Sequence, residues 1–154
     1  MARDDGAVRS AAEQSAALLT AAGLPKMSSR VFMALTVAEV GLTAAELSHQ
    51  LGVSAAAISG AVRYLQTVGI VRRVADSGSR RDRYEIPPHA WYAVMSAKSP
   101  LYTALASLAE AASRAIDDPN SAATERLDEM AHFYRFFDEK LPELMAEWNA
   151  LKDR

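Results

Sequence analysis

The chain has 154 residues, of which 50% are hydrophobic and 23% are charged, a balance typical of a globular domain with room for appended helices. The formal net charge of -2 argues against a protein that is basic over its whole surface, such as a protein that wraps nucleic acid. The absence of cysteine excludes disulfides, thiolate metal sites and thiol-based redox sensing.

Two helices are predicted in the first forty residues. The spacing of apolar residues over 8–22 predicts the first helix. Ser28 or Ser29 is the expected N-cap of the second helix, and Gly41 its expected end. Charged and polar residues interrupt the alanine-rich start, so it is neither a membrane span nor an export signal, and we expect a cytoplasmic protein.

The next segment predicts two helices joined by a tight turn. Thr43 and Glu46 have the spacing of a capping box at the start of the first helix. Gly52 can adopt the positive φ that the turn needs, and Ser54 is a favourable N-cap for the second helix. The predicted buried stripe of this second helix consists of Ile58, Val62 and Leu65.

The opposite face of the helix predicted over 54–68 carries mainly small side chains. A helix that enters the major groove must be slim near its N-terminus, because its backbone has to approach the base edges. Gly60 costs roughly 1 kcal/mol relative to alanine inside a helix, which favours close approach to a partner. An ordinary solvated helix face is the alternative. The candidate DNA contacts on this face are Ser54, Ala55, Ala56, Ser59, Gly60, Arg63 and Tyr64.

Residues 70–86 predict a β-hairpin with a basic tip. Residues 76–79 have turn composition, and residues 81–86 alternate with a period of two. Six arginines stand against two aspartates between residues 63 and 83, a local balance of +4. Arginines at a hairpin tip suit the negative potential of the minor groove, so Arg80, Arg81 and Arg83 are further candidate DNA contacts. Arg73 is instead expected to pair with Asp76 or Asp82 and hold the shape of the hairpin.

These residues carry a resemblance to a known family. The run L-x-x-x-L-G-V-S-x-x-x-I-S-x-x-V-x-x-L-x-x-x-G-I-V-x-R, followed by a short arginine-bearing hairpin, resembles the winged helix-turn-helix of the MarR family of bacterial transcription regulators. The G-S-R-R-D-R-Y wing and the A-W-Y after it are more similar to the GbsR-type branch. The resemblance implies a mainly α fold with a small β-hairpin wing. It places the DNA-binding domain at 26–87, with 1–25 and 88–154 forming a helical region for dimerisation and effector binding.

The C-terminal part predicts more helices and a long apolar stripe. A helix interrupted near Ser99 and Pro100 is followed by a turn at 117–121 and a final helix, in which Pro142 predicts a kink or a restart. Eight successive heptad positions of the final helix are apolar. The favoured interpretation is a homodimer interface, and packing within one chain is the alternative. The eight residues are Leu127, Met130, Tyr134, Phe137, Leu141, Leu144, Trp148 and Leu151.

A small-molecule effector is a further expectation that follows from the resemblance. The candidate residues for its crevice are Trp91, Tyr92, Tyr102, Phe133 and Phe136, with ordinary core packing as the alternative. An enzyme, a metal and a cofactor are not expected. His49, His89 and His132 lie far apart in sequence without metal-ligand spacing, and the chain has no glycine-rich phosphate loop.

The sequence therefore predicts a dimeric DNA-binding regulator. It would read a pseudo-palindromic operator in double-stranded DNA with the helix over 54–68 and the wing over 70–86, and a small effector would modulate it. The alternative is a winged-helix module that binds proteins and uses its basic wing to meet an acidic partner.

Overall fold

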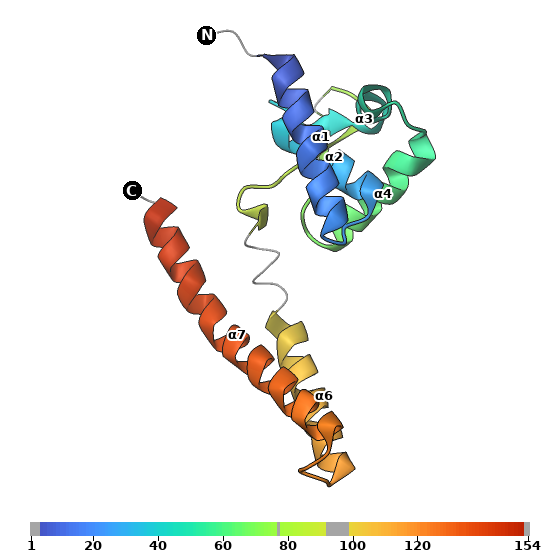
Figure 1. The fold of residues 1–154 in the computed structure, drawn as a ribbon. Helices are drawn as coiled ribbons and strands as arrows, with labels where there is room; N and C mark the ends of the chain where they lie inside the picture. Colours follow the sequence, from blue (N-terminus) through green and yellow to red (C-terminus); the bar gives the residue numbers. More distant parts are fainter. Residues whose placement is uncertain (1–3, 77, 92–98, 153–154) are drawn as a thin grey trace. The chain divides into compact units, whose positions relative to one another are not determined.

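The computed structural model describes residues 4–76, 78–91 and 99–152. The chain forms two compact units, Met1–Trp91 and Tyr92–Arg154. Helices dominate both units, and a small antiparallel sheet lies in the first (Figure 1), as the predicted fold class requires. Among the described residues, no helix is long and apolar enough to cross a lipid bilayer.

The first unit begins with two helices packed on each other, α1 (Asp5–Ala21) and α2 (Lys26–Val37). The predicted start of α2 at Ser28 or Ser29 is wrong. Pro25 precedes the helix at the N-cap position, where its fixed φ suits a helix start, and both serines are buried within the helix. The hydroxyl of Ser29 donates to the Pro25 carbonyl over 3.1 Å.

The predicted end of α2 at Gly41 is also wrong, because the helix ends at Val37 and Ala38 is already extended. Gly41 has a different reason to be glycine. A Cβ atom at this position would lie 2.9 Å from the carbonyl oxygen of Tyr84. Only glycine therefore allows the loop before β1 to approach the sheet so closely.

The helix-turn-helix consists of α3 (Ala44–Leu51) and α4 (Ala55–Thr67), and its predicted local signals are confirmed. The Thr43 hydroxyl accepts from the Glu46 amide over 3.1 Å, and a Glu46 carboxylate oxygen accepts from the Thr43 amide over 2.7 Å. Gly52 has a φ of 64° and ends α3, while the Ser54 hydroxyl caps α4 by accepting from the Ala57 amide.

One hydrophobic core joins α2, α3 and α4, and it includes the stripe predicted for α4. Tyr84 and Ile86 pack against this core from the end of the hairpin. The apolar residues buried in it are Val31, Phe32, Ala34, Leu35, Leu47, Leu51, Ile58, Ala61, Val62, Leu65 and Val71. Burial of this stripe fixes which face of α4 remains exposed.

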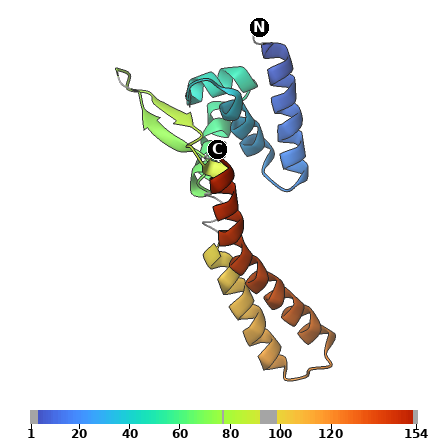
Figure 2. The ribbon, with the colours of Figure 1, turned by 90° about the vertical axis from the view of Figure 1, so that its left-hand side faces the viewer.

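The hairpin is part of a three-stranded antiparallel sheet. Strands β2 (Arg72–Ala75) and β3 (Asp82–Glu85) form the predicted hairpin, and β1 (Leu42–Thr43) pairs with the other side of β3. The strand order is β1-β3-β2. Two residues are too few to show a period-two pattern, so β1 has no signal in the sequence. Figure 2 shows the hairpin, which we call the wing, projecting from the helices of the first unit.

The second unit is a helical hairpin of α6 (Ser99–Ile116) and α7 (Ala122–Lys152), which lie side by side (Figures 1 and 2). Pro100 stands in the first turn of α6, where a missing N–H costs nothing. The α7 helix runs through Pro142 without interruption, so the helix does not restart there. The loss of one i→i−4 hydrogen bond is outweighed by the turns on either side.

Candidate nucleic-acid interface

The solvent-facing side of α4 is free of packing within the first unit. All seven residues predicted to contact DNA from this helix and its cap are exposed. A Cβ atom on Gly60 would meet nothing within 4 Å. Nothing in the first unit therefore requires glycine at this position, which leaves the space above it open to a partner.

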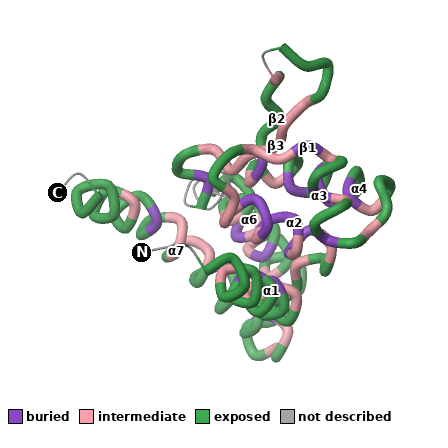
Figure 3. Tube along the Cα trace, turned by 90° about the horizontal axis from the view of Figure 1, so that it is seen from above, coloured by how far each residue is buried: buried purple, intermediate pink, exposed green. Residues whose placement is uncertain are grey.

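The arginines of the wing divide into two groups by their neighbours. Arg72 pairs with Glu85, its cross-strand partner, at 2.5 Å, and Arg73 pairs with Asp82 at 2.5 Å. The pairing of Arg73 with Asp82 is one of the two predicted for it. Among the described residues, no acidic side chain forms an ion pair with Arg63, Arg80 or Arg81, and all three are exposed. The excess positive charge of the segment therefore lies on α4, at Arg63, and at the tip of the wing, at Arg80 and Arg81. Figure 3 shows the outer part of the wing coloured as exposed.

Arg83 was predicted to contact DNA, but its half-buried guanidinium is held by acceptors of the protein. Its Nε donates to Asp76 Oδ2 over 3.1 Å. Its Nη1 donates to the Gly41 carbonyl over 2.7 Å and to Glu46 Oε2 over 3.1 Å. The side chain is only 31% exposed. This geometry favours a role inside the wing over the predicted DNA contact, because two carboxylates already surround the cation.

Glu46 serves both the capping box and this cluster. The backbone N–H of Thr43 is the largest influence that holds the pKa of Glu46 below its ordinary value, and the Thr43 hydroxyl and the charge of Arg83 act in the same direction. The Glu46 carboxylate is therefore ionised in the folded protein at neutral pH. The sequence revealed the capping box, but no signal indicated the second use of Glu46.

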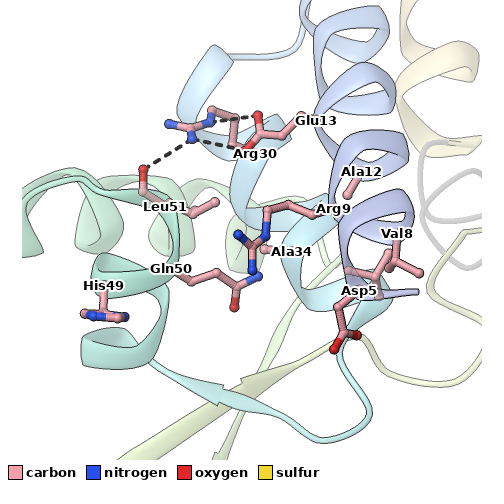
Figure 4. A pocket seen from close by; sticks show the side chains of 11 residues that line it. Asp5, Val8, Arg9, Ala12, Glu13, Arg30, Ala34, His49, Gln50 and Leu51 are labelled. Carbon is pink, nitrogen blue, oxygen red and sulfur yellow. Dashed lines mark hydrogen bonds and ion pairs between the residues drawn. The ribbon is translucent and has the colours of Figure 1, made fainter. Parts of the chain in front are cut away.

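A cavity of about 400 Å³ lies between α1, α2 and α3 (Figure 4). Arg30 lines it, donating to both carboxylate oxygens of Glu13 and, over 3.2 Å, to the Leu51 carbonyl at the end of α3. Figure 4 shows Arg9 reaching from α1 towards Gln50 across this cavity. No sequence motif predicts this cavity, because three separate segments of the chain line it.

The predicted effector residues fall in both units. In the first unit, the ring of Trp91 lies 5.1 Å from that of Phe32, centroid to centroid. In the second, Tyr102 stacks on Tyr134, while Phe133 and Phe136 are each 58% exposed. Tyr92 lies outside the described residues. The crevice that these side chains were expected to line remains a prediction.

The predicted dimerisation stripe divides into two parts along α7. Tyr134 and Phe137 contact the ring of Tyr102 on α6, and Leu141 is buried. Leu127 is half-buried and Met130 is 38% exposed. In the last three turns, Leu144, Trp148 and Leu151 are 51%, 46% and 61% exposed. Part of the stripe thus packs within one chain, and its C-terminal part presents apolar side chains to solvent.

Comparisons with known proteins assign two parts of the chain to the same family. Residues 22–82 match the MarR family, and residues 89–151 match the MmpR5-like MarR family transcriptional regulators. The chain belongs to the MarR family of transcriptional regulators. The two matches cover consecutive parts of the chain, so the family assignment of this MarR-family protein rests on both of its units. Among the described residues, no three His, Asp or Glu side chains come together to hold a metal ion.

A solved structure shares the fold of this MarR-family protein. A crystal structure described as a transcriptional regulator is 23% identical and covers 93% of this chain and 98% of its own, with a TM-score of 0.80. MepR, a transcription regulator of the Staphylococcus aureus multidrug efflux pump MepA, is 15% identical, covering 96% of this chain and 90% of its own, with a TM-score of 0.43. None of the curated proteins matches the sequence.

Proposed function

We propose that this MarR-family protein is a homodimeric regulator that binds a pseudo-palindromic operator, with α4 in the major groove and the wing tip against the minor groove. The observation that supports this most directly is the division of the arginines. Arg63, Arg80 and Arg81 are exposed without ion pairs among the described residues, beside a helix face made of small side chains. Exposed guanidinium groups are the side chains that phosphates and minor grooves attract.

The individual residues have different proposed roles. Ser59 and Arg63 provide the direct base contacts, since both lie on the exposed face and can hydrogen-bond to base edges. The methyl groups of Ala55 and Ala56 lie against thymine methyls. The remaining residues, Ser54, Gly60, Tyr64, Arg80 and Arg81, meet the DNA backbone and the minor groove. Affinity therefore depends mainly on phosphates and DNA shape.

In each chain, α4 and the wing together form one reading head. Dimerisation places two reading heads on one operator. The exposed Leu144, Trp148 and Leu151 support an interface built from α7 of two chains, together with α1. A two-fold axis then sets the half-sites roughly 34–36 Å apart, about one turn of DNA. Such a regulator acts in the cytoplasm on the bacterial chromosome.

An effector would act by changing the spacing of the two heads. A ligand that binds one dimer geometry better than another shifts the population towards it. We propose that Trp91, Tyr92, Tyr102, Phe133 and Phe136 contribute to its crevice. The wing sequence likewise supports a position near the GbsR-type branch of the family.

Selection of bound duplexes from a random DNA pool tests the proposed function. We expect an inverted repeat whose half-sites are about one helical turn apart. For the wild-type chain, the logarithm of affinity should fall linearly with the logarithm of salt concentration, by about 0.9 for each phosphate contacted. Failure to bind any duplex at low salt would sink the proposal and favour a winged-helix module for protein contacts.

Arg81→Ala tests the role of the wing tip. The substitution should weaken binding to every DNA sequence and reduce the salt slope by about 0.9, because one phosphate contact is lost. Arg126→Ala is the matched control, since it removes an exposed arginine from α7 in the second unit and should change neither quantity. An Arg81→Ala chain that keeps both the affinity and the slope of the wild type contradicts the assignment of the wing.

A further inference from the structure

We propose that Arg83 is a positioning residue: it holds the wing against α3 so that Arg80 and Arg81 reach DNA, and it makes no DNA contact of its own. This inference rests on the proposed function, which it deepens by assigning one role to the tip arginines and another to the arginine below them.

The partners of Arg83 come from three separate segments of the first unit. Asp76 directly follows the first strand of the wing, Gly41 lies in the loop before β1, and Glu46 lies on α3. These partners are 7, 42 and 37 residues away from Arg83 in the chain. One side chain therefore ties the turn of the wing, the neighbouring loop and the first helix of the helix-turn-helix to each other.

The charges around Arg83 oppose a phosphate contact. Asp76 and Glu46 are both carboxylates, so the cluster has a formal charge of −1 with Arg83 included. A phosphate approaching this guanidinium would be repelled by both. Arg80 and Arg81 have no such carboxylate partner among the described residues, so a phosphate meets their full positive charge.

The strand pairings of Arg83 connect the wing to the helix-turn-helix. Arg83 stands opposite Thr43 in the β1–β3 pairing and opposite Val74 in the β2–β3 pairing. Thr43 is the cap of α3, and α3 leads through the Gly52 turn into α4. A wing held at one angle to α3 does not need to be ordered when DNA binds, which raises affinity without an additional contact.

The fork shape of arginine matters for this role. Two of its nitrogens serve acceptors that lie in different directions, and lysine offers only a single charged point. We expect Arg83→Met to weaken DNA binding, because it removes the guanidinium that holds the wing. Arg83→Lys should not restore the DNA affinity. A simple phosphate contact would be partly restored by lysine, because the charge is kept.

Removing the charge of Asp76 gives the sharpest test, because the two possible roles of Arg83 predict opposite changes in DNA affinity. Asp76→Asn removes a negative charge from the wing, so a DNA contact governed only by charge would become tighter. If Arg83 needs Asp76 to hold the wing, binding of the full chain to a mixed-sequence duplex of about 30 base pairs should instead weaken by about threefold to tenfold. Glu85→Gln is the control, because it removes the same charge from a pair within the hairpin, and it should not weaken binding. Equal or tighter binding by Asp76→Asn overturns the proposal.

A double-mutant cycle with the same duplex tests whether Arg83 acts through the tip. Arg81→Ala should cost less affinity in the Arg83→Met chain than in the wild type, because the tip arginine is already displaced. Additive losses would mean that Arg83 binds DNA independently, and the inference would be wrong.

Hydrogen exchange without DNA separates this inference from the proposed function. In the free protein, the amides of β2 and β3 should exchange about threefold to tenfold faster in Arg83→Met and in Asp76→Asn than in the wild type. Unchanged exchange in both variants overturns the role of Arg83, whether or not the wild type binds DNA. A wild-type chain that binds no duplex contradicts the proposed function, and the exchange result then still decides whether Arg83 holds the wing.

Discussion

At Gly60 in α4, we expect helix stability and DNA binding to have opposite requirements. No neighbour in the first unit limits a side chain there, and the residue lies inside a helix. Gly60→Ala should therefore raise the free energy of unfolding by about 0.5–1 kcal/mol, because alanine is the better helix former. The same methyl group should weaken DNA binding, since it occupies the space through which the backbone approaches the bases.

Denaturant unfolding and DNA titration measure the two effects of Gly60→Ala separately. Gln66→Ala is a suitable control, because Gln66 is exposed near the C-terminal end of α4 and away from the predicted contact face. It should leave DNA affinity close to that of the wild type. If Gly60→Ala is stabilised and still binds DNA as tightly as the wild type, the close approach at Gly60 is refuted.

At the residue scale, the sequence identified the types of contact better than their partners. The caps at Thr43 and Ser54 were predicted correctly because each involves residues within three positions along the chain. The wing arginines look alike in sequence, yet the guanidinium of Arg83 meets internal acceptors and that of Arg81 pairs with no carboxylate among the described residues. Whether a side chain pairs within the protein or faces solvent depends on its neighbours in space. The local sequence does not specify those neighbours.

At the element scale, the junction of α3 with the wing should be sensitive to acid. The pKa of Glu46 lies below its ordinary value of 4.5 in the folded chain, first because of the Thr43 backbone N–H. A lowered folded pKa means that the ionised carboxylate contributes stability above the unfolded pKa, and that this contribution is lost as pH falls through the folded pKa. Unfolding midpoints in urea should therefore fall more steeply below about pH 4.5 in the wild type than in Glu46→Gln.

The control for this pH dependence is an exposed carboxylate outside the first unit. Glu129→Gln removes the same charge from α7, away from the capping box. Its midpoints should follow those of the wild type over the same pH range. Parallel curves for the wild type and Glu46→Gln would show that the capping box and its link to Arg83 do not carry the acid sensitivity.

The sequence predicted the boundaries of helices and strands correctly only where residues close together in the chain determine them. Helices α3 and α4 begin and end at the predicted caps, whereas α2 begins earlier and ends earlier than predicted. Serines at 28 and 29 imitate a cap in sequence, but Pro25 before them already starts the helix. Strand β1 forms because β3 offers it a free edge, a property of the folded sheet.

At the scale of the whole molecule, the C-terminal turns of α7 test the proposed dimer. Leu144→Glu places a charge beside the exposed apolar side chains of Trp148 and Leu151. If these residues form the interface, the buried charge should convert the dimer into a monomer at micromolar concentrations, because an unpaired buried charge costs several kcal/mol. Sedimentation equilibrium measures the change.

Ala146→Glu is the matched control for the dimer, since it introduces the same charge at an exposed position outside the stripe. It should leave the sedimentation behaviour unchanged. A Leu144→Glu chain that still sediments as a dimer would assign the stripe to packing within one chain, as Tyr134 and Phe137 already do against Tyr102.

The sequence by itself determined the helix-turn-helix, the hairpin and the apolar stripe of the last helix, because caps, turns and periodic burial depend on residues a few positions apart. Only the tertiary structure decided which of the arginines pair with carboxylates of the protein. That outcome depends on strand register and on the approach of Gly41 to β3, which bring Asp76, Gly41 and Glu46 together around Arg83 from across the first unit. An ion pair forms where the fold places opposite charges within reach, and distance along the chain does not reveal it.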